Sequence, residues 1–482
     1  MLENLKPEKV FKYFEEISMI PRCSGNEKGV SDYMVKFAKD RNLEVIQDSA
    51  LNIIIKKSGT KGYENSPITI LQGHLDMVGE KNGDTIHDFD KDPLKLYIDG
   101  DLIKAHGTTL GADNGVAVAM SMAILDSDDI PHPPLEVVMT TDEEVGLLGA
   151  GAIDANLLKG RLLLNLDSDG DGIFLTSCAG GLRTDNSVKI DWTDAPADYI
   201  SCELSVKGLA GGHSGAEIIL DKANSNVLMG RILYILNGKY DIYLKSINGG
   251  LKDNAIPREC VSEVFVSENE LANIKKTLAT LRGEIFNEYK SVESEINFNI
   301  SQIEIDSKKV FSKDFTKKLL SGLQAMPNGV YAMSKSIDGL VETSNNIGII
   351  RTNSEFITIS SSIRSSVLSR KLFLLDKHFA VANLMGGELT TNGDYPGWEY
   401  EEVSPLREIC LKSYKELYNK EPIVTAIHAG LECGIFSGKM PGLDMIAFGP
   451  DIHNAHTPDE ALGIASLERV YNLLLKILEN LK

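Results

Sequence analysis

The stretch Ile68-Thr69-Ile70-Leu71-Gln72-Gly73-His74-Leu75-Asp76-Met77-Val78 decides the fold. Its apolar beginning is typical of a buried strand, and the run ends at Gly73, just before a histidine and an aspartate two positions apart. Residues i and i+2 of an extended chain lie on the same side, so Asp76 can orient the imidazole of His74. A carboxylate behind a histidine is common around bound metal ions. Alone, this pair is weak evidence, because an ordinary hydrogen-bonded histidine can also end a strand.

Three further apolar runs end in the same way. They are residues 135–141 before Asp142-Glu143-Glu144, 162–166 before Asp167, and 444–450 before a loop with His453 and His456. Asp113 is a fifth candidate, in a glycine-rich loop before a predicted helix of small residues at 116–125. Ligands of open α/β sheets bind beyond the carboxyl ends of the strands. Nitrogen and oxygen donors gathered there predict a metal site of the zinc type.

Composition limits the class of protein. A chain of 482 residues favours two domains, and a net charge of -20 argues against nucleic acid or an anionic membrane as partner. No apolar run approaches the length of a membrane span, and the N-terminal residues do not resemble a secretory signal. Six scattered cysteines without a Cys-x-x-Cys pair indicate free thiols in a reducing compartment, so we expect a cytoplasmic protein.

The order of predicted elements indicates one domain inserted into another. Strands and helices alternate up to about Cys178, which predicts a mostly parallel sheet. Residues 200–390 combine strands with single helices, and the earlier pattern then returns. We therefore predict the α/β class, with a discontinuous catalytic domain of residues 1–195 and 394–482 whose mostly parallel sheet is flanked by helices. Residues 196–393 form a large inserted α+β lid domain in this prediction.

The last helix has a clear expected beginning. Thr457-Pro458-Asp459-Glu460 has the form of a capping box with proline at the first helical position. The apolar stripe expected to be buried consists of Leu467, Val470, Leu474, Ile477, Leu478 and Leu481.

Six short motifs occur in one order along the chain. They are Gly-His-Leu-Asp at 73–76, Gly-Ala-Asp-Asn-Gly at 111–115, Asp-Glu-Glu-Val-Gly at 142–146, Asn-Leu-Asp at 165–167, Gly-Gly-His-Ser-Gly at 211–215 and His-Thr-Pro-Asp-Glu at 456–460. Together they resemble the co-catalytic dinuclear zinc exopeptidases that include carboxypeptidase G, the aminoacylases and the carnosinases. Ile20-Pro21-Arg22, the run 107–115, Asn254-Ala255-Ile256-Pro257-Arg258 and His428-Ala429-Gly430-Leu431-Glu432 further resemble the aminoacyl-histidine dipeptidases.

This resemblance implies a metallo-dipeptidase that hydrolyses Xaa-His dipeptides such as carnosine, with a small dipeptide as its substrate. It implies two divalent ions, Zn²⁺ first, although Mn²⁺ and Co²⁺ also suit these donors. Asp113 would bridge the ions, His74 and Asp167 would complete one ligand set, and Glu144 and His456 the other. Glu143 would be the general base that takes the proton of the attacking water, and Asp76 would orient His74.

The resemblance also implies how substrate is held. His213 of the lid would stabilise the oxyanion, and Arg364 would bind the C-terminal carboxylate, to which its planar fork of donors is suited. Asn254 and the backbone of Gly430 would seat the substrate. A non-proline cis peptide bond is implied between Asp113 and Asn114.

Several alternatives stay open. His453 could replace His456 as ligand, His428 could be a core or a pocket residue, and Arg364 could be a plain charge on the sheet surface. The run Asp169-Gly170-Asp171-Gly172 resembles a calcium loop but lacks its remaining ligands, which favours a solvated turn. A deacylase or a tripeptidase of the same family is the alternative function. A non-catalytic metal-binding relative is disfavoured, since it would not need Glu143 beside Glu144. The large insertion could close the site within one chain, or it could form a homodimer.

Overall fold

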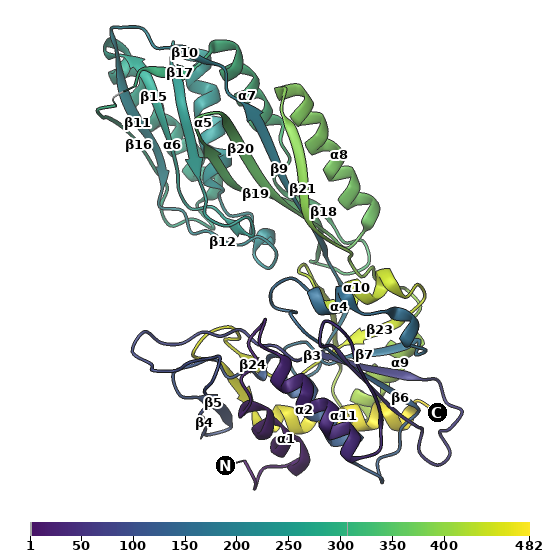
Figure 1. Ribbon diagram of the computed structural model, residues 1–482. Coiled ribbons are helices and arrows are strands. Elements are labelled where there is room, and N and C mark those ends of the chain that lie inside the picture. Colours follow the sequence, from purple (N-terminus) through teal and green to yellow (C-terminus); the bar gives the residue numbers. More distant parts are fainter. Residues whose placement is uncertain (1, 306) are drawn as a thin grey trace. The chain divides into compact units, whose positions relative to one another are not determined.

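The computed structural model describes residues 2–305 and 307–482, which divide into two compact units (Figure 1). The first unit comprises Met1–Cys178, Trp398–Ala426 and Leu431–Lys482. The inserted unit comprises Ala179–Gly397 and Ile427–Gly430. The predicted boundaries lay at 195/196 and 393/394. The first boundary lies earlier, between Cys178 and Ala179, and the second lies later, between Gly397 and Trp398. The first boundary is earlier because the strand β9 (Gly180–Lys189) pairs with strands of the inserted unit.

The first unit is built on an eight-stranded sheet with the order β1-β2-β6-β3-β7-β23-β8-β22. The strands are β1 (Glu44–Gln47), β2 (Ile53–Lys57), β3 (Thr69–His74), β6 (Leu135–Thr140), β7 (Leu162–Asn165), β8 (Ile173–Cys178), β22 (Ile423–Ile427) and β23 (Asp444–Ala447). The four central strands β6, β3, β7 and β23 run parallel, and β1, β2 and β8 add antiparallel pairs. The predicted α/β class with a mainly parallel sheet is confirmed.

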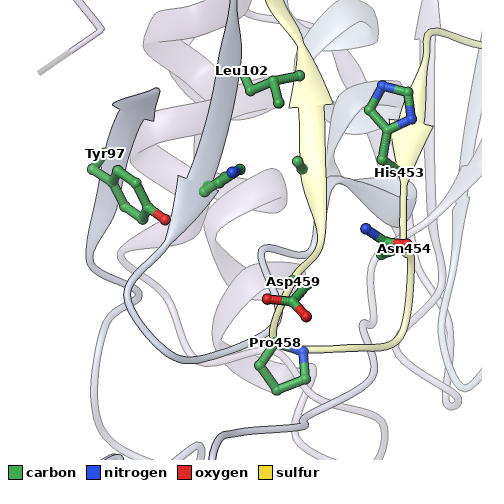
Figure 2. Close-up of a pocket in the computed structure, with 8 residues that line it drawn as sticks. Tyr97, Leu102, His453, Asn454, Pro458 and Asp459 are labelled. Atoms are coloured by element: carbon green, nitrogen blue, oxygen red, sulfur yellow. The ribbon is translucent and has the colours of Figure 1, made fainter. Parts of the chain in front are cut away.

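A small antiparallel sheet with the order β24-β25-β5-β4 also belongs to this unit (Figure 2). Its strands are β4 (Leu96–Asp99), β5 (Leu102–Ala105), β24 (Ile452–His453) and β25 (Ala461–Gly463). The last helix, α11 (Ile464–Asn480), begins only after β25. The capping box predicted at 457–460 is therefore wrong: Glu460 accepts hydrogen bonds from Leu110 and the residues after it, far away in the sequence.

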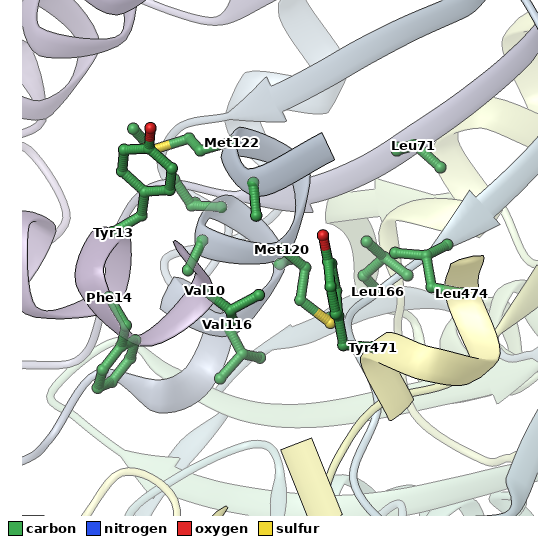
Figure 3. Packing of buried hydrophobic residues seen from close by; sticks show 14 of the residues in the cluster. Val10, Tyr13, Phe14, Leu71, Val116, Met120, Met122, Leu166, Tyr471 and Leu474 are labelled. Carbon is green, nitrogen blue, oxygen red and sulfur yellow. The ribbon is translucent and has the colours of Figure 1, made fainter. Parts of the chain in front are cut away.

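One helix of the first unit, α3 (Ala112–Leu125), is almost wholly buried. The other helices of this unit are α1 (Glu8–Ser18), α2 (Lys28–Asp40), α4 (Leu148–Ala152), α9 (Pro405–Tyr418), α10 (Glu432–Lys439) and α11. Thirteen of the 14 residues of α3 are buried, as expected for a helix that is apolar on all sides. Figure 3 shows Val116 and Met120 of α3 beside Val10 of α1 and Tyr471 of α11. The predicted stripe of α11 is buried as well.

The inserted unit contains a nine-stranded sheet with the order β16-β11-β15-β13-β19-β20-β9-β21, in which β18 also pairs with β19. Its strands are β9, β11 (Tyr199–Lys207), β13 (Tyr243–Gly249), β15 (Cys260–Ser267), β16 (Asn297–Gln302), β18 (Gly329–Met333), β19 (Val341–Thr352), β20 (Phe356–Ser365) and β21 (Glu388–Tyr395). Two-stranded ladders join β10 (Trp192–Asp194) to β17 (Lys309–Phe311) and β12 (Gly212–His213) to β14 (Ala255–Ile256). The helices are α5 (Ser225–Lys239), α6 (Leu271–Tyr289), α7 (Lys313–Ala325) and α8 (Leu368–Met385). The α+β character predicted for this segment is confirmed.

Two further expectations concern the whole chain. All six cysteines are free thiols, and five of them are buried. Across the described residues, no helix combines the length and the apolar character that a membrane crossing needs.

Candidate metal centre

Adjacent parallel strands bring the predicted ligands to one edge of the sheet. His74 at the end of β3 lies opposite Thr140, the last residue of β6, so the turn 142–144 follows directly beside it. On the other side, Gln72 of β3 lies opposite Asn165, two residues before Asp167. A Cβ atom at Gly73 would collide with Asn114 and Ala117. The glycine therefore lets the start of α3, with Asp113, approach the strand end.

The first group of donors surrounds His74. Its Nε2 lies 3.1 Å from Oδ1 of Asp113 and 3.6 Å from Oδ1 of Asp167. Its Nδ1 lies 3.2 Å from Oδ1 of Asp76, as predicted from their spacing. Asp76 also accepts hydrogen bonds from the backbone N–H groups of Glu143 and Glu144, at 3.1 and 3.2 Å. One buried carboxylate thus orients both the imidazole and the acidic turn.

The second group surrounds His456. Its Nε2 lies 3.1 Å from Oδ2 of Asp113 and 3.0 Å from Oε1 of Glu144. The two oxygens of Asp113 therefore face one imidazole each, which is the geometry expected of a carboxylate shared by two cations. The peptide bond from Asp113 to Asn114 is cis, as predicted. Glu143 forms a third possible metal-binding group with His74 and Glu144, whose donor atoms lie within 4.8 Å of one another. Proximity alone therefore does not show whether Glu143 is a metal ligand or a general base.

The electrostatics of both groups suit cations. Hydrogen bonds to Asp113 and Glu144 raise the pKa of His456 to about 11. Burial opposes a charge on His74, yet Asp167, Asp113 and Asp76 together raise its pKa well above the usual range. Burial, supported by Asp167 and other carboxylates, raises the pKa of Glu143 strongly. Clustered carboxylates with imidazoles form a donor set that fits two divalent ions, which would offset the repulsion between the acids.

The alternative ligand His453 has different surroundings. It lies on β24 and lines a surface pocket of about 520 Å³ with Tyr97, Leu102 and Asp459 (Figure 2). The clusters of described residues that could hold a metal ion include His456 and not His453. His456 has a φ of 64°, a left-handed conformation that is uncommon outside glycine and clusters at functional sites.

The acidic run after Asp167 forms a turn. The backbone N–H of Gly170 donates to the carbonyl of Pro450, and Asp171 forms an ion pair with Arg469. Burial, together with Asp113 and Asp167, raises the pKa of Asp169 to about 7. Asp169 therefore interacts electrostatically with Asp113 and Asp167. Asp171 connects the turn to α11 through its ion pair with Arg469.

The predicted substrate residues all belong to the inserted unit. Arg364 on β20 is only 8% exposed, which contradicts the alternative of a plain surface charge. Its Nη1 donates to the hydroxyl of Tyr395 at 3.4 Å, and its buried Nε has no partner among the described residues. Burial and the charge of Arg364 lower the pKa of both His213 and His428, the latter to about 3.

The two histidines near Arg364 have defined surroundings. Nδ1 of His213 accepts the backbone N–H groups of Gly215 and Ala216, at 3.3 and 3.1 Å. The proton of the neutral ring is then on Nε2, which makes that atom a hydrogen-bond donor. Nε2 of His428 lies 2.7 Å from Oγ of Ser344. His428 is therefore a buried, hydrogen-bonded residue, and it also interacts electrostatically with Arg364.

Asn254 and Gly430 have less specific surroundings. The backbone carbonyl of Asn254 accepts the N–H of Ser214, which ties it to the His213 loop. A Cβ atom at Gly430 would lie 3.0 Å from the ring of Tyr395. Asn254 thus contacts the loop that carries His213, and Gly430 lies beside Tyr395, the hydrogen-bond partner of Arg364.

The sequence interpretation assigned no role at the metal centre to three buried charged residues. Arg22 donates to the carbonyls of Leu75, Asp76 and Gly111. Glu432 accepts hydrogen bonds from Gln72 and from Oγ1 of Thr140, the latter at 2.7 Å. Glu460 accepts backbone N–H groups around Asp113. Each ends a quoted motif, Ile-Pro-Arg, His-Ala-Gly-Leu-Glu and His-Thr-Pro-Asp-Glu, and that position was the available signal.

The chain is similar to known proteins over its whole length. The chain is 37% identical over 480 residues to the cytosol non-specific dipeptidase of Escherichia coli (strain K12), covering 100% of this chain and 99% of that protein. The crystal structure of an aminoacylhistidine dipeptidase from Vibrio alginolyticus matches with a TM-score of 0.94 and 37% identity, over 100% of this chain and 98% of that one. The aminopeptidase PepT from Bacillus cereus ATCC 10987 shares the fold, with a TM-score of 0.58 at 15% identity and 99% coverage of both chains. Residues 70–480 match the model of peptidase family M20/M25/M40, and the chain belongs to this family.

Proposed function

We propose that this protein is a metal-dependent dipeptidase whose substrates include Xaa-His dipeptides. The observation that carries the proposal is Asp113, whose two oxygens face His74 and His456, beside an acidic turn that offers both Glu143 and Glu144. The similar full-length relatives are named as dipeptidases, one of them for aminoacylhistidine. Because the Escherichia coli relative is named as a cytosol enzyme, we also propose the cytoplasm as location.

The donors of the first unit have distinct proposed roles. Two divalent ions, preferably Zn²⁺, would be held by Asp113 together with His74 and Asp167 on one side and with Glu144 and His456 on the other. Such ions, when bound, supply Lewis-acid polarisation of the scissile carbonyl and of the attacking water. Glu143 removes the proton of that water and passes it to the leaving amine. Its raised pKa supports a group that can hold a proton between the two steps.

We propose that Asp76 fixes the positions of His74 and of the acidic turn that carries Glu143 and Glu144. It contacts Nδ1 of His74 and accepts the N–H groups of Glu143 and Glu144. The ring of His74 and the acidic turn are thereby oriented by the same carboxylate, a role typical of groups behind metal ligands.

The residues of the inserted unit are proposed to read the chain end of the substrate. Arg364 binds the terminal carboxylate. Its buried Nε has no partner among the described residues, which supports this role because a buried N–H without a partner is costly. His213 donates through Nε2 to the oxyanion that forms during hydrolysis. Asn254 and the backbone of Gly430 help seat the peptide. A carboxylate site one residue beyond the scissile bond would limit substrates to dipeptides.

A substrate panel tests the proposal. Purified protein is assayed with Xaa-His and other dipeptides, their C-terminal amides, tripeptides and N-acetyl amino acids, each with and without a chelator. We expect chelator-sensitive hydrolysis of free dipeptides, and rates at least about 100-fold lower for the amides, since a charge-assisted carboxylate contact is lost. Equal rates for amide and free acid would refute the role of Arg364. Preferred hydrolysis of N-acetyl amino acids would make the enzyme a deacylase.

A further inference from the structure

Glu460 has an unusual set of partners for a residue without a proposed role. Its side chain is 2% exposed. Oε2 accepts the backbone N–H groups of Leu110 and Gly111, at 2.7 and 2.9 Å, and Oε1 accepts those of Ala112 and Asp113, at 2.8 and 3.3 Å. One carboxylate thus satisfies four consecutive N–H groups, which lead into the first turn of α3, where such groups otherwise lack partners.

The same residue lies four positions after His456, in the turn between β24 and β25. Asp113 and His456 belong to one donor cluster, with Glu144, yet they are 343 positions apart in the chain. Asp113 and His456 contact each other directly. The hydrogen bonds of Glu460 provide a second connection between the two loops that carry these residues. The spacing of Asp113 and His456 therefore depends on Glu460.

Arg22 connects the same loop to the other histidine. Its buried guanidinium donates to the carbonyls of Leu75 and Asp76, beside His74, and to the carbonyl of Gly111. It also interacts electrostatically with Glu460. The loop 110–113 is thus held on its carbonyl side by Arg22 and on its N–H side by Glu460.

We propose that Glu460 is a positioning residue that sets the affinity of the centre for its second divalent ion, the one assigned to Asp113, Glu144 and His456. This inference deepens the proposed function and rests on its assignment of ligands. A carboxylate is required because each of its two oxygens accepts two N–H groups. A glutamine would keep one accepting oxygen and would turn its amide hydrogens toward two of the backbone donors.

The test is a metal titration of metal-free protein with Zn²⁺ against a chromogenic chelator, for the wild type, Glu460→Gln and a matched control. Glu136→Gln is that control, because Glu136 is also 2% exposed and accepts backbone N–H groups, from Lys159 and Gly160, near the opposite end of β6. We expect Glu460→Gln to weaken the second ion at least tenfold and the first by a clearly smaller factor, because Asp113 would contact both ions and His456 only the second. Glu136→Gln should change neither affinity.

Glu460→Asp provides a second variant if the glutamine form does not fold. It keeps the charge but shortens the side chain, so we expect it to weaken the second ion by a smaller factor than Glu460→Gln. Equal affinities in wild type and either folded Glu460 variant would overturn the proposal. Equal weakening of both ions together with a lower melting temperature would overturn it as well, because it would indicate a general role in folding.

The titration contains no substrate, so it is independent of the proposed dipeptidase activity. A wild type that binds two ions and cleaves no dipeptide would refute the proposed function while the role of Glu460 could still be measured. With active enzyme, Glu460→Gln should lower kcat at limiting Zn²⁺ and recover as Zn²⁺ is raised, whereas KM should change little.

Discussion

Replacing Glu143 by glutamine separates a catalytic base from a metal ligand. The glutamine keeps the shape of the side chain and the backbone hydrogen bond from residue 143 to Asp76, which is 3.1 Å long. It removes the negative charge, and with it the ability to take a proton. The acidic turn and its contact with His74 through Asp76 should therefore persist, and both metal ions should remain bound.

The expected loss follows from the proposed role. Proton transfer by a positioned group contributes typically about 10²–10⁴-fold to the rate, which corresponds to about 3–5 kcal/mol of activation free energy. Because Glu143 is half-buried and burial raises its pKa, bulk water cannot easily replace it as proton acceptor. We expect kcat to fall by a factor near the upper end of this range, and KM to stay within a few-fold of the wild-type value.

The assay combines steady-state hydrolysis of a dipeptide with metal analysis of the purified variant. Asp142→Asn is the matched control, since Asp142 lies in the same turn and its carboxylate accepts the N–H of Gly25 instead of facing the metal cluster. Asp142→Asn should keep most of the turnover. The reasoning is refuted if Glu143→Gln binds one ion fewer, which would make Glu143 a ligand, or if its kcat falls less than tenfold.

Three further predictions concern substrate binding, pH and packing. Arg364→Ala should raise KM and lower kcat, by at least about tenfold in kcat/KM, and Arg364→Lys should restore little because the paired donors are lost; an unchanged preference for free acids over amides would contradict this. Burial lowers the pKa of His378 to about 4, so the unfolded chain binds more protons between pH 6.5 and 4, and stability should fall by up to about 3 kcal/mol as the pH drops through that window. His378→Gln should flatten this dependence in urea titrations at several pH values, and an unchanged slope would show that His378 is not its source. Met120→Ala, at a wholly buried position of α3, should cost about 2–5 kcal/mol in urea unfolding, and a loss below 1 kcal/mol would mean that the core collapses around it.

The strand ends of the first unit could be predicted because their signals are local. Apolar runs of four to six residues end directly at His74, Thr140 and Asn165, and parallel pairing then brings the following residues together without further information. The ordered motifs identified the candidate metal ligands. In the structure these lie in two groups that share Asp113, one with His74 and Asp167 and the other with Glu144 and His456.

Long-range partners were the part that the sequence could not predict. The pattern Thr-x-x-Glu is the same whether Glu460 closes a capping box or accepts N–H groups almost 350 positions away. The strand β19 carries little local signal for a related reason: it buries Thr343, Ser344 and Asn345 instead of alternating apolar residues. The polar strand β9 likewise resembles a loop until its partners β20 and β21 are known.

The central claim is that Asp113 is shared by two divalent ions with separate imidazole ligands. Anomalous X-ray diffraction at the zinc edge, from crystals of the protein grown with Zn²⁺, locates such ions directly. The account predicts two anomalous peaks, one bonded to Asp113, His74 and Asp167 and the other to Asp113, Glu144 and His456. A single peak, or a peak bonded to Glu143 or His453 in place of these ligands, would contradict it.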